Sequence, residues 1–193
     1  LRQVPNSQKI HTIYQISVSD YMKGLSEVPE SWTDEAIEAQ VIASRSQAVS
    51  RVIERGGAGT FNMERKQDCY CNLRDDKTDQ IFRGWSGEIS HPKWVAAVNS
   101  TSQQVLFSGG KVALALFSSS SGGATENYSD VFGGDEHPYL KTVVDTPAFS
   151  NLANNPHKKW AAGYREKVIA DIFNFSWILN IQVIERNDSG SAK

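Results

Sequence analysis

One long amphipathic helix, predicted to begin after Thr33 and to end at Gly56, constrains the fold of this chain most. Thr33 is a good N-cap, and the acidic residues Asp34 and Glu35 fit the first turn of a helix. The pair Gly56-Gly57 then stops the pattern. A continuous apolar stripe predicts that this helix packs into the core. The stripe consists of Ile37, Val41, Ile42, Ala48, Val49, Val52 and Ile53.

A strand and a helical turn are predicted ahead of this helix. Residues 11–18 alternate apolar and polar side chains, which is typical of a strand. Ser19 and Asp20 resemble a cap for a helical turn that Gly24 ends. The stretch that follows places Glu27 on a short turn beside a proline.

Shorter elements and long loops follow the helix. The Gly/Ser run at 118–123 comes directly after an apolar segment, which favours a fixed polar loop over a flexible linker. These patterns predict the α+β class: a mixed sheet with hairpins, packed against the long N-terminal helix and shorter helices, with long irregular loops. The expected elements are irregular structure at 61–87, a short helix opened by His91-Pro92, a hairpin of strands 104–107 and 112–117, a helix at 164–173, a strand at 178–184 and a turn at 186–190.

Composition and charge limit the class of protein. A chain of 193 residues is enough for one sizeable domain, and we expect residues 1–193 to form a single one. The formal net charge of −2, with dispersed Lys and Arg, gives no reason to expect nucleic acid as a partner. No apolar run approaches the roughly 20 residues that a membrane-spanning helix needs. Residues 1–8 are too polar for a signal-peptide core, so any signal is expected upstream or already removed.

The cysteines Cys69 and Cys71 are separated by a single residue. A disulfide across one residue is strained and uncommon. As a metal site, the pair supplies fewer ligands than zinc usually takes from a protein. Two interpretations stay open: free or structural cysteines, or a half-site for a metal or a partner linkage. None of the histidines that could complete such a site lies at a motif-like spacing: His11, His91, His137 and His157.

Glu27 is the residue best placed for chemistry. A carboxylic acid held against Val28, Pro29 and Trp32 is a candidate for a raised pKa and for general-acid catalysis. Taken alone, the turn fits better a glutamate that precedes a helix and is solvated or complements the helix dipole. A Gly-x-Ser-x-Gly elbow, a phosphate-binding glycine loop and a His-Glu-x-x-His pair are all absent from the sequence. Polar loops with Trp and Tyr faces are what a carbohydrate site needs.

An ordered set of motifs across residues 12–190 resembles the SpoIID/LytB domain. The resemblance implies a domain that continues beyond the turn at 186–190, so the chain is expected to be truncated at its C-terminal end. The motifs are Tyr21-x-x-Gly24, Glu27-Val-Pro29 with Ser31-Trp32, Ala39-Gln40-Val-Ile-Ala-Ser-Arg45-Ser46, Cys69-x-Cys71-x-Leu73 with Asp79-Gln80, Ser119-Ser-Ser-Gly-Gly-x-Thr-Glu126, and Val131-Phe-Gly-Gly134 leading to Pro138-Tyr-Leu140-Lys141.

This resemblance implies one of two functions. Some members of the family are lytic transglycosylases that act on peptidoglycan glycan strands, and others are described as enhancers of cell-wall amidases. The family's catalytic glutamate corresponds to Glu27, although many members have a longer spacing than Gly24-Leu-Ser-Glu27. Zinc ligands reported for some relatives do not carry over, because Cys-x-Cys is too small a match. We therefore expect no cofactor, with zinc as the open alternative.

A transglycosylase makes sense of a lone carboxylate. An ordinary glycoside hydrolase uses a pair of carboxylates, whereas a lytic transglycosylase needs one. Its acid protonates the glycosidic oxygen between MurNAc and GlcNAc. The same group then takes the proton of the sugar's C6 hydroxyl, which closes a 1,6-anhydro ring. A second carboxylate at Asp130 or Asp145 would restore ordinary hydrolysis.

The expected partners follow from the same resemblance. They are peptidoglycan glycan strands and, for the non-catalytic alternative, an N-acetylmuramoyl-L-alanine amidase. The location is expected to be extracellular, in the cell wall or anchored to the membrane and facing outward. For Gln40 and Arg45, a buried structural role is the alternative to substrate contact. For the loop at 119–126, the alternative is a turn with a structural role only. The residues expected to bind substrate are Gln40, Arg45, Ser119, Ser120, Ser121, Thr125, Glu126, Tyr139 and Lys141.

Overall fold

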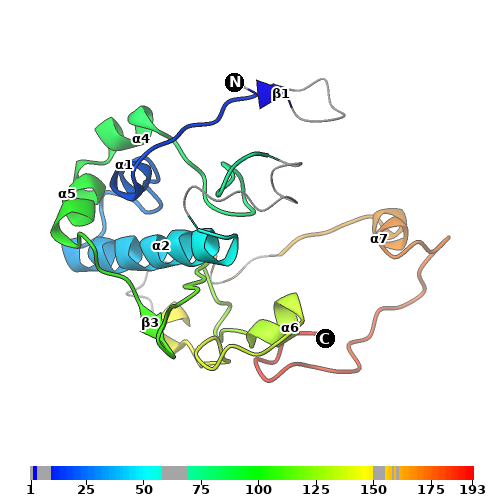
Figure 1. Cartoon of the computed structure of the whole chain (residues 1–193). Coiled ribbons are helices and arrows are strands. Elements are labelled where there is room, and N and C mark those ends of the chain that lie inside the picture. The colour runs from blue at the N-terminus through cyan, green and yellow to red at the C-terminus, as the bar shows by residue number, and fades with distance from the viewer. Residues whose placement is uncertain (1, 4–9, 58–68, 150–154, 158, 160) are drawn as a thin grey trace. The chain divides into compact units, whose positions relative to one another are not determined.

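The computed structural model describes residues 2–3, 10–57, 69–149, 155–157, 159 and 161–193 (Figure 1). The chain divides into two compact units, Leu1–Phe117 and Ser118–Lys193, which are treated separately below. Helices accompany short antiparallel strands, so the α+β class is confirmed. The strands of the described residues form two separate two-stranded sheets, where the sequence predicted one mixed sheet.

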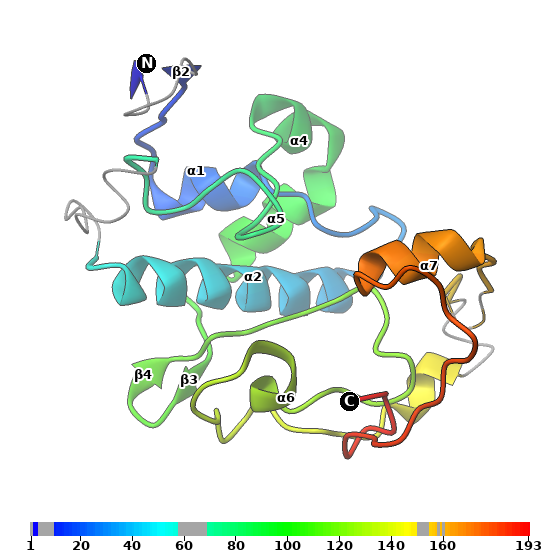
Figure 2. The same cartoon turned by 90° about the vertical axis from the view of Figure 1, so that its right-hand side faces the viewer.

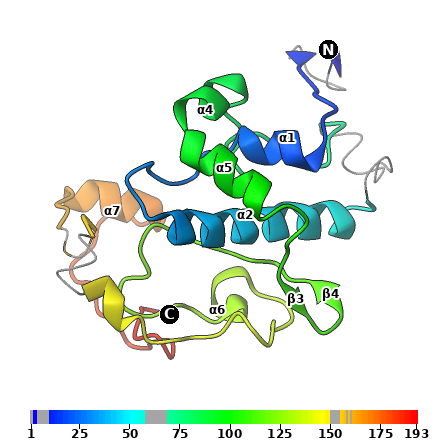
Figure 3. The ribbon, with the colours of Figure 1, turned by 90° about the vertical axis from the view of Figure 1, so that its left-hand side faces the viewer.

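Three helices form the core of the N-terminal unit. Helix α2 (Asp34–Glu54) is crossed by α5 (Pro92–Ser100), and α1 (Val18–Lys23) packs against both (Figure 3). Burying these apolar side chains removes them from water, which is the main force holding the three helices together. The buried cluster comprises Met22, Leu25, Ile37, Val41, Trp94, Ala97 and Val98.

The long helix is the one that the sequence predicts. The Thr33 hydroxyl accepts a hydrogen bond from the Ala36 N–H at 3.4 Å, which caps the N-terminus of α2. At the other end, Gly56 and Gly57 take positive φ angles of 97° and 86° and lead the chain away. Within the stripe, Ile37, Val41 and Ala48 are buried, Ile42, Val49 and Val52 are half-buried, and Ile53 near this end is 58% exposed.

The predicted strand at 11–18 is wrong. Strand β2 covers only Ile10–His11 and pairs antiparallel with β1 (Arg2–Gln3). The Ser17 hydroxyl accepts the Asp20 N–H at 3.1 Å, so α1 starts at Val18 rather than after a cap at Ser19. Because of this cap, the last residue of the predicted strand belongs to the helix instead.

A helix that the sequence did not predict, α4 (Trp85–Ser90), precedes α5. It begins inside the segment 61–87, which was predicted to be irregular. Part of that segment, residues 61–68, lies outside the described residues. The predicted hairpin is confirmed but is shorter: β3 (Phe107–Ser108) pairs with β4 (Lys111–Val112) across Gly109-Gly110. Both glycines have positive φ, as tight hairpin turns require.

The C-terminal unit contains α6 (Tyr128–Phe132), a short 3-10 helix (Thr146–Phe149) and α7 (Glu166–Ile172) (Figure 2). Helix α7 and the turn at 186–190 agree with the sequence, and the turn is closed by a bridge between Arg186 and Ala192. The predicted strand at 178–184 is wrong, because no described segment pairs with it. Among the described residues, no helix is long and apolar enough to span a membrane.

Candidate active site

The turn that carries Glu27 is tied to α5 by a second glutamate. The Glu30 carboxylate accepts the backbone N–H groups of Lys93 at 3.1 Å and Trp94 at 3.3 Å. These groups belong to the first turn of α5, whose N–H donors lack partners within the helix. The Trp94 indole in turn donates to the Met22 carbonyl at 2.6 Å. Sequence reasoning missed Glu30, because its partners lie more than sixty residues away.

Glycines allow the backbone to pack closely behind the turn. A Cβ on Gly24 would lie 2.4 Å from the Phe82 ring, and a Cβ on Gly87 would lie 3.0 Å from the Gly24 carbonyl oxygen. That oxygen accepts the Arg83 N–H at 2.8 Å. Ser26 has a φ of 48°, a left-handed conformation that is uncommon for serine. The backbone of residues 24–26, directly before Glu27, is therefore closely packed and constrained.

Glu27 itself is half-buried, and among the described residues no hydrogen-bond donor contributes to the pKa of its carboxyl group. Burial raises the pKa of Glu27, and the Arg83 guanidinium opposes this shift. A carboxyl group of this kind holds a proton at higher pH than a solvated one. The site thus has what a general acid needs: a raised pKa and a reacting group that is not already engaged.

A chain of polar groups connects α1 with α2 beside this turn. The Tyr21 hydroxyl donates to Gln80 Oε1 at 3.2 Å, and Gln80 Nε2 donates to the Ser44 carbonyl at 3.4 Å. Gln40 Nε2 donates to the Ser44 hydroxyl at 3.3 Å. Gln40 is half-buried on α2, and its predicted contact with substrate stays a prediction. Sequence reasoning listed Tyr21 and Gln80 as motif residues without giving them a role.

Arg45 has a structural role. Its guanidinium is buried and makes five hydrogen bonds near the C-terminal end of α5. The acceptors include the carbonyls of Thr101 at 2.8 Å, Gln104 at 3.0 Å and Val98 at 3.1 Å. These oxygens lie at the negative end of the helix dipole, which favours a cation. These contacts fit the buried structural role that the sequence left open, as a cap on α5, with carbonyls and the Thr101 hydroxyl as partners rather than an acidic side chain. Substrate contact by Arg45 stays a prediction.

The loop that carries Gln80 and Phe82 is held by a buried ion pair. Asp79 lies 2.7 Å from Arg55 Nη2 and 2.9 Å from Arg55 Nη1 through its two oxygens. Arg55 also donates to the Asn72 carbonyl at 2.7 Å, and the Arg74 N–H donates to Asp79 at 2.8 Å. The ion pair therefore fixes both flanks of the loop to the end of α2.

Cys69 and Cys71 form a disulfide at the start of this loop. The disulfide favours structural cysteines, one of the two interpretations that the sequence left open, because in this state neither sulfur is a thiolate that could bind a metal. A disulfide was considered uncommon here because only one residue separates the cysteines. The two Cα atoms nevertheless lie 5.2 Å apart, within the usual range for a disulfide. Among the described residues, no cluster of three or more His, Cys, Asp or Glu side chains could hold a metal ion.

The predicted substrate loop lies in the C-terminal unit and is held by its own hydrogen bonds. Ser121 donates to Asp145 at 2.6 Å, Ser120 accepts from Asn155 at 3.0 Å, and Thr125 donates to the Lys141 carbonyl at 2.7 Å. This supports the fixed loop that the sequence predicted. A shallow hollow of about 330 Å³ is lined by Ser119, Ser120, Gly122 and His157.

The remaining predicted residues of this unit also have partners within it. Glu126 accepts the Ser189 hydroxyl at 2.5 Å, and hydrogen bonds from Ser189 and Ser191 lower the pKa of Glu126. The Lys141 ammonium pairs with Glu136. The Tyr139 ring lies 5.7 Å from that of His137. Substrate contact by these side chains stays a prediction.

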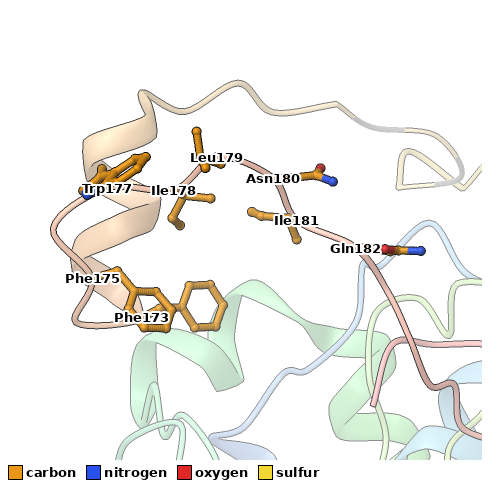
Figure 4. Close-up of a pocket in the computed structure, with 8 residues that line it drawn as sticks. All are labelled: Phe173, Phe175, Trp177, Ile178, Leu179, Asn180, Ile181 and Gln182. Carbon is orange, nitrogen blue, oxygen red and sulfur yellow. The ribbon is translucent and has the colours of Figure 1, made fainter.

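The two carboxylates considered for hydrolysis also lie in the C-terminal unit. Asp145 accepts the Ser121 hydroxyl, and Asp130 accepts the Asn127 amide at 3.0 Å. The same unit contains an apolar hollow of about 610 Å³ along residues 173–182 (Figure 4). Aromatic and aliphatic side chains dominate its lining, and none of the lining residues is titratable. It offers no acid or base for catalysis.

Of the two half-buried carboxylates on the turn that carries Glu27, Glu30 is engaged by α5, which leaves Glu27 as the candidate acid–base group. The family model described as "SpoIID: Stage II sporulation protein" matches residues 6–107, more than half of the chain. The chain belongs to the SpoIID family. This family is linked to peptidoglycan processing, which supports a cell-wall-related role.

Two curated relatives are similar to this chain. An uncharacterized protein of Brachyspira hyodysenteriae is 26% identical over 183 residues, which cover 90% of this chain and 43% of the relative. The amidase enhancer of Bacillus subtilis is 32% identical over 127 residues, which cover 65% of this chain and 15% of the relative. The chain therefore matches less than half the length of either relative.

Proposed function

We propose that this protein is a lytic transglycosylase that cleaves peptidoglycan glycan strands between MurNAc and GlcNAc. Glu27 is the single acid–base in this reaction. The observation that supports the proposal most is the state of the Glu27 carboxyl group: half-buried, with a raised pKa and without a hydrogen-bond donor among the described residues. Membership of the SpoIID family supports a cell-wall substrate.

The reaction starts with protonated Glu27. Its proton passes to the glycosidic oxygen, the bond between that oxygen and C1 of MurNAc breaks, and an oxocarbenium-like centre forms at C1. The Glu27 carboxylate then removes the proton of the C6 hydroxyl while the C6 oxygen bonds to C1. The products are a GlcNAc end and a 1,6-anhydroMurNAc end. Water is not consumed, and Glu27 is returned to its protonated state.

The two influences on Glu27 suit its two roles. Burial favours the protonated acid that begins the reaction, and the nearby Arg83 cation stabilises the carboxylate that exists halfway through it. An acid whose pKa lies close to the working pH serves both steps better than one far from it. The partly dry surroundings also disfavour attack by water.

A second candidate function is a non-catalytic module that binds the cell wall and stimulates an N-acetylmuramoyl-L-alanine amidase. The observation that favours it is the similarity to a protein named an amidase enhancer. In this case Glu27 would contact glycan without transferring a proton. An amidase would then be a partner of this protein, in addition to the glycan strands.

An extracellular location, in the wall or on the outer face of a membrane, is part of both proposals. The Cys69–Cys71 disulfide supports it, because disulfides persist in oxidising compartments and are rare in the cytosol.

The two functions are separated by their products. Glycan strands, with and without peptide stems, are incubated with the protein and analysed by mass spectrometry for 1,6-anhydro ends. A transglycosylase produces these ends, and Glu27→Gln abolishes them while glycan binding persists. Glycan binding without such products, combined with faster release of peptide stems by an added amidase, would favour the second function.

A further inference from the structure

Tyr21 lies beside the proposed acid and is not used by the mechanism above. Its ring stacks on Phe82, with the ring centres 5.6 Å apart and the planes 9° from parallel. The same Phe82 ring packs against Gly24, where an added Cβ would lie 2.4 Å from it, three residues before Glu27. The Tyr21 side chain is half-buried, and the charge of Glu27 contributes to raising the pKa of its phenol. Tyr21 thus combines a fixed ring, a position near Glu27 and partial access from solvent.

The direction of its hydrogen bond follows from the neighbouring groups. The Ser44 carbonyl is an acceptor only, so the NH₂ group of the buried Gln80 amide must face it. The amide oxygen of Gln80 then faces Tyr21 and has to accept. The Tyr21 hydroxyl therefore donates its one proton to Gln80 at 3.2 Å.

The phenol also stays protonated. Burial raises the pKa of Tyr21, and the negative charges of Asp79, Glu27 and Asp75 raise it further, against a smaller opposing effect of Arg55. Since its proton is directed to Gln80, the Tyr21 oxygen can only accept a further hydrogen bond. A ligand atom at this position must be a donor, such as a sugar hydroxyl or an acetamido N–H, and a carboxylate would be rejected.

We infer that Tyr21 positions the substrate by accepting a hydrogen bond from a hydroxyl or acetamido N–H of the sugar bound at Glu27. Gln80 serves as the positioning residue that directs the Tyr21 proton away from the ligand. This inference rests on the proposed function for its ligand, a glycan strand, but its effect on binding is independent of catalysis.

The test compares glycan affinity in a background that cannot turn over. Glu27→Gln is combined with Tyr21→Phe, which keeps the ring on Phe82 and removes only the acceptor. A neutral hydrogen bond contributes about 0.5–1.5 kcal/mol, so affinity for metal-free, purified glycan strands should fall about two- to tenfold. Tyr14→Phe, at a tyrosine that is 70% exposed, is the matched control and should leave affinity unchanged.

The same substitution in the active protein should raise KM and leave kcat within about twofold, because the contact exists in both ground and transition states. Absence of anhydro products from the unmodified protein would refute the proposed function, while the binding comparison would still decide the role of Tyr21. Equal affinities of the Tyr21→Phe and Tyr14→Phe proteins would overturn the inference.

A second measurement does not depend on how well Tyr21→Phe folds. Fluorotyrosine placed at position 21 alone keeps the phenol and its hydrogen bond to Gln80. Because this is the single fluorinated residue, its fluorine NMR signal needs no further assignment. Saturating glycan should shift this signal, whereas fluorotyrosine at position 14 should not respond. An unchanged signal at position 21 would contradict a contact with the sugar.

Discussion

Arg55 and Asp79 form an ion pair in which both side chains are almost completely buried, and each carboxylate oxygen faces a guanidinium nitrogen. Removing one partner leaves the other as an uncompensated buried charge, which costs about 3–5 kcal/mol. Asp79→Ala should therefore lower the free energy of unfolding by about 3 kcal/mol in urea titrations. Asp135→Ala, at an exposed aspartate, is the control and should change it by less than about 0.5 kcal/mol. Equal stabilities of the two variants would refute the structural role of the pair.

The Glu30 carboxylate holds the turn of Glu27 against the N-terminus of α5. Loss of such a cap costs about 1 kcal/mol, so Glu30→Ala should lower the melting temperature and reduce glycan cleavage. Glu30→Gln keeps one acceptor oxygen and should retain more of both. If Glu30→Ala were more stable than Glu30→Gln, the cap would not be the reason for the effect.

The pH dependence of cleavage should respond to Arg83. The acid form of Glu27 starts the reaction, so the rate falls as pH rises through its pKa. Arg83 lowers the pKa of Glu27, and Arg83→Gln should therefore move this decline to higher pH. Lys77→Gln removes a positive charge at another exposed position and should leave the pH–rate profile unchanged. A decline at lower pH in Arg83→Gln would contradict the assigned electrostatics.

The oxidation state of the cysteines can be measured directly. Without a reductant, iodoacetamide should label neither Cys69 nor Cys71, because both sulfurs are in the disulfide. After reduction, mass spectrometry should find both labelled. Labelling of both cysteines in the native, unreduced protein would show free thiols and would reopen the metal half-site.

Elements governed by local signals could be predicted from the sequence. The N-cap at Thr33, the apolar stripe and Gly56-Gly57 are enough to define α2, and His91-Pro92 is enough to locate α5. The strand predicted at 178–184 fails for the opposite reason. An apolar segment is suited to a sheet, but a strand also needs a partner, and no described segment supplies one.

The candidate site shows the same division. Glu27 was found from its motif, and its raised pKa agrees with the expectation from the residues around it. The role of Glu30 could not be predicted, and for Arg45 the sequence left a buried structural role and substrate contact both open. The contacts of both residues depend on backbone groups of α5 that are far away in the sequence. A buried polar residue on a predicted helix can serve a ligand or a distant helix end, and only the packing of the two helices distinguishes them.

In the proposed reaction, Glu27 gives a proton to the glycosidic oxygen and takes one from the C6 hydroxyl of the same MurNAc. The most direct test is mass spectrometry of glycan strands treated with the unmodified protein and with Glu27→Gln. The unmodified protein should produce 1,6-anhydroMurNAc ends and Glu27→Gln none, with glycan binding retained by both. Anhydro ends formed equally well by Glu27→Gln would contradict this role of Glu27.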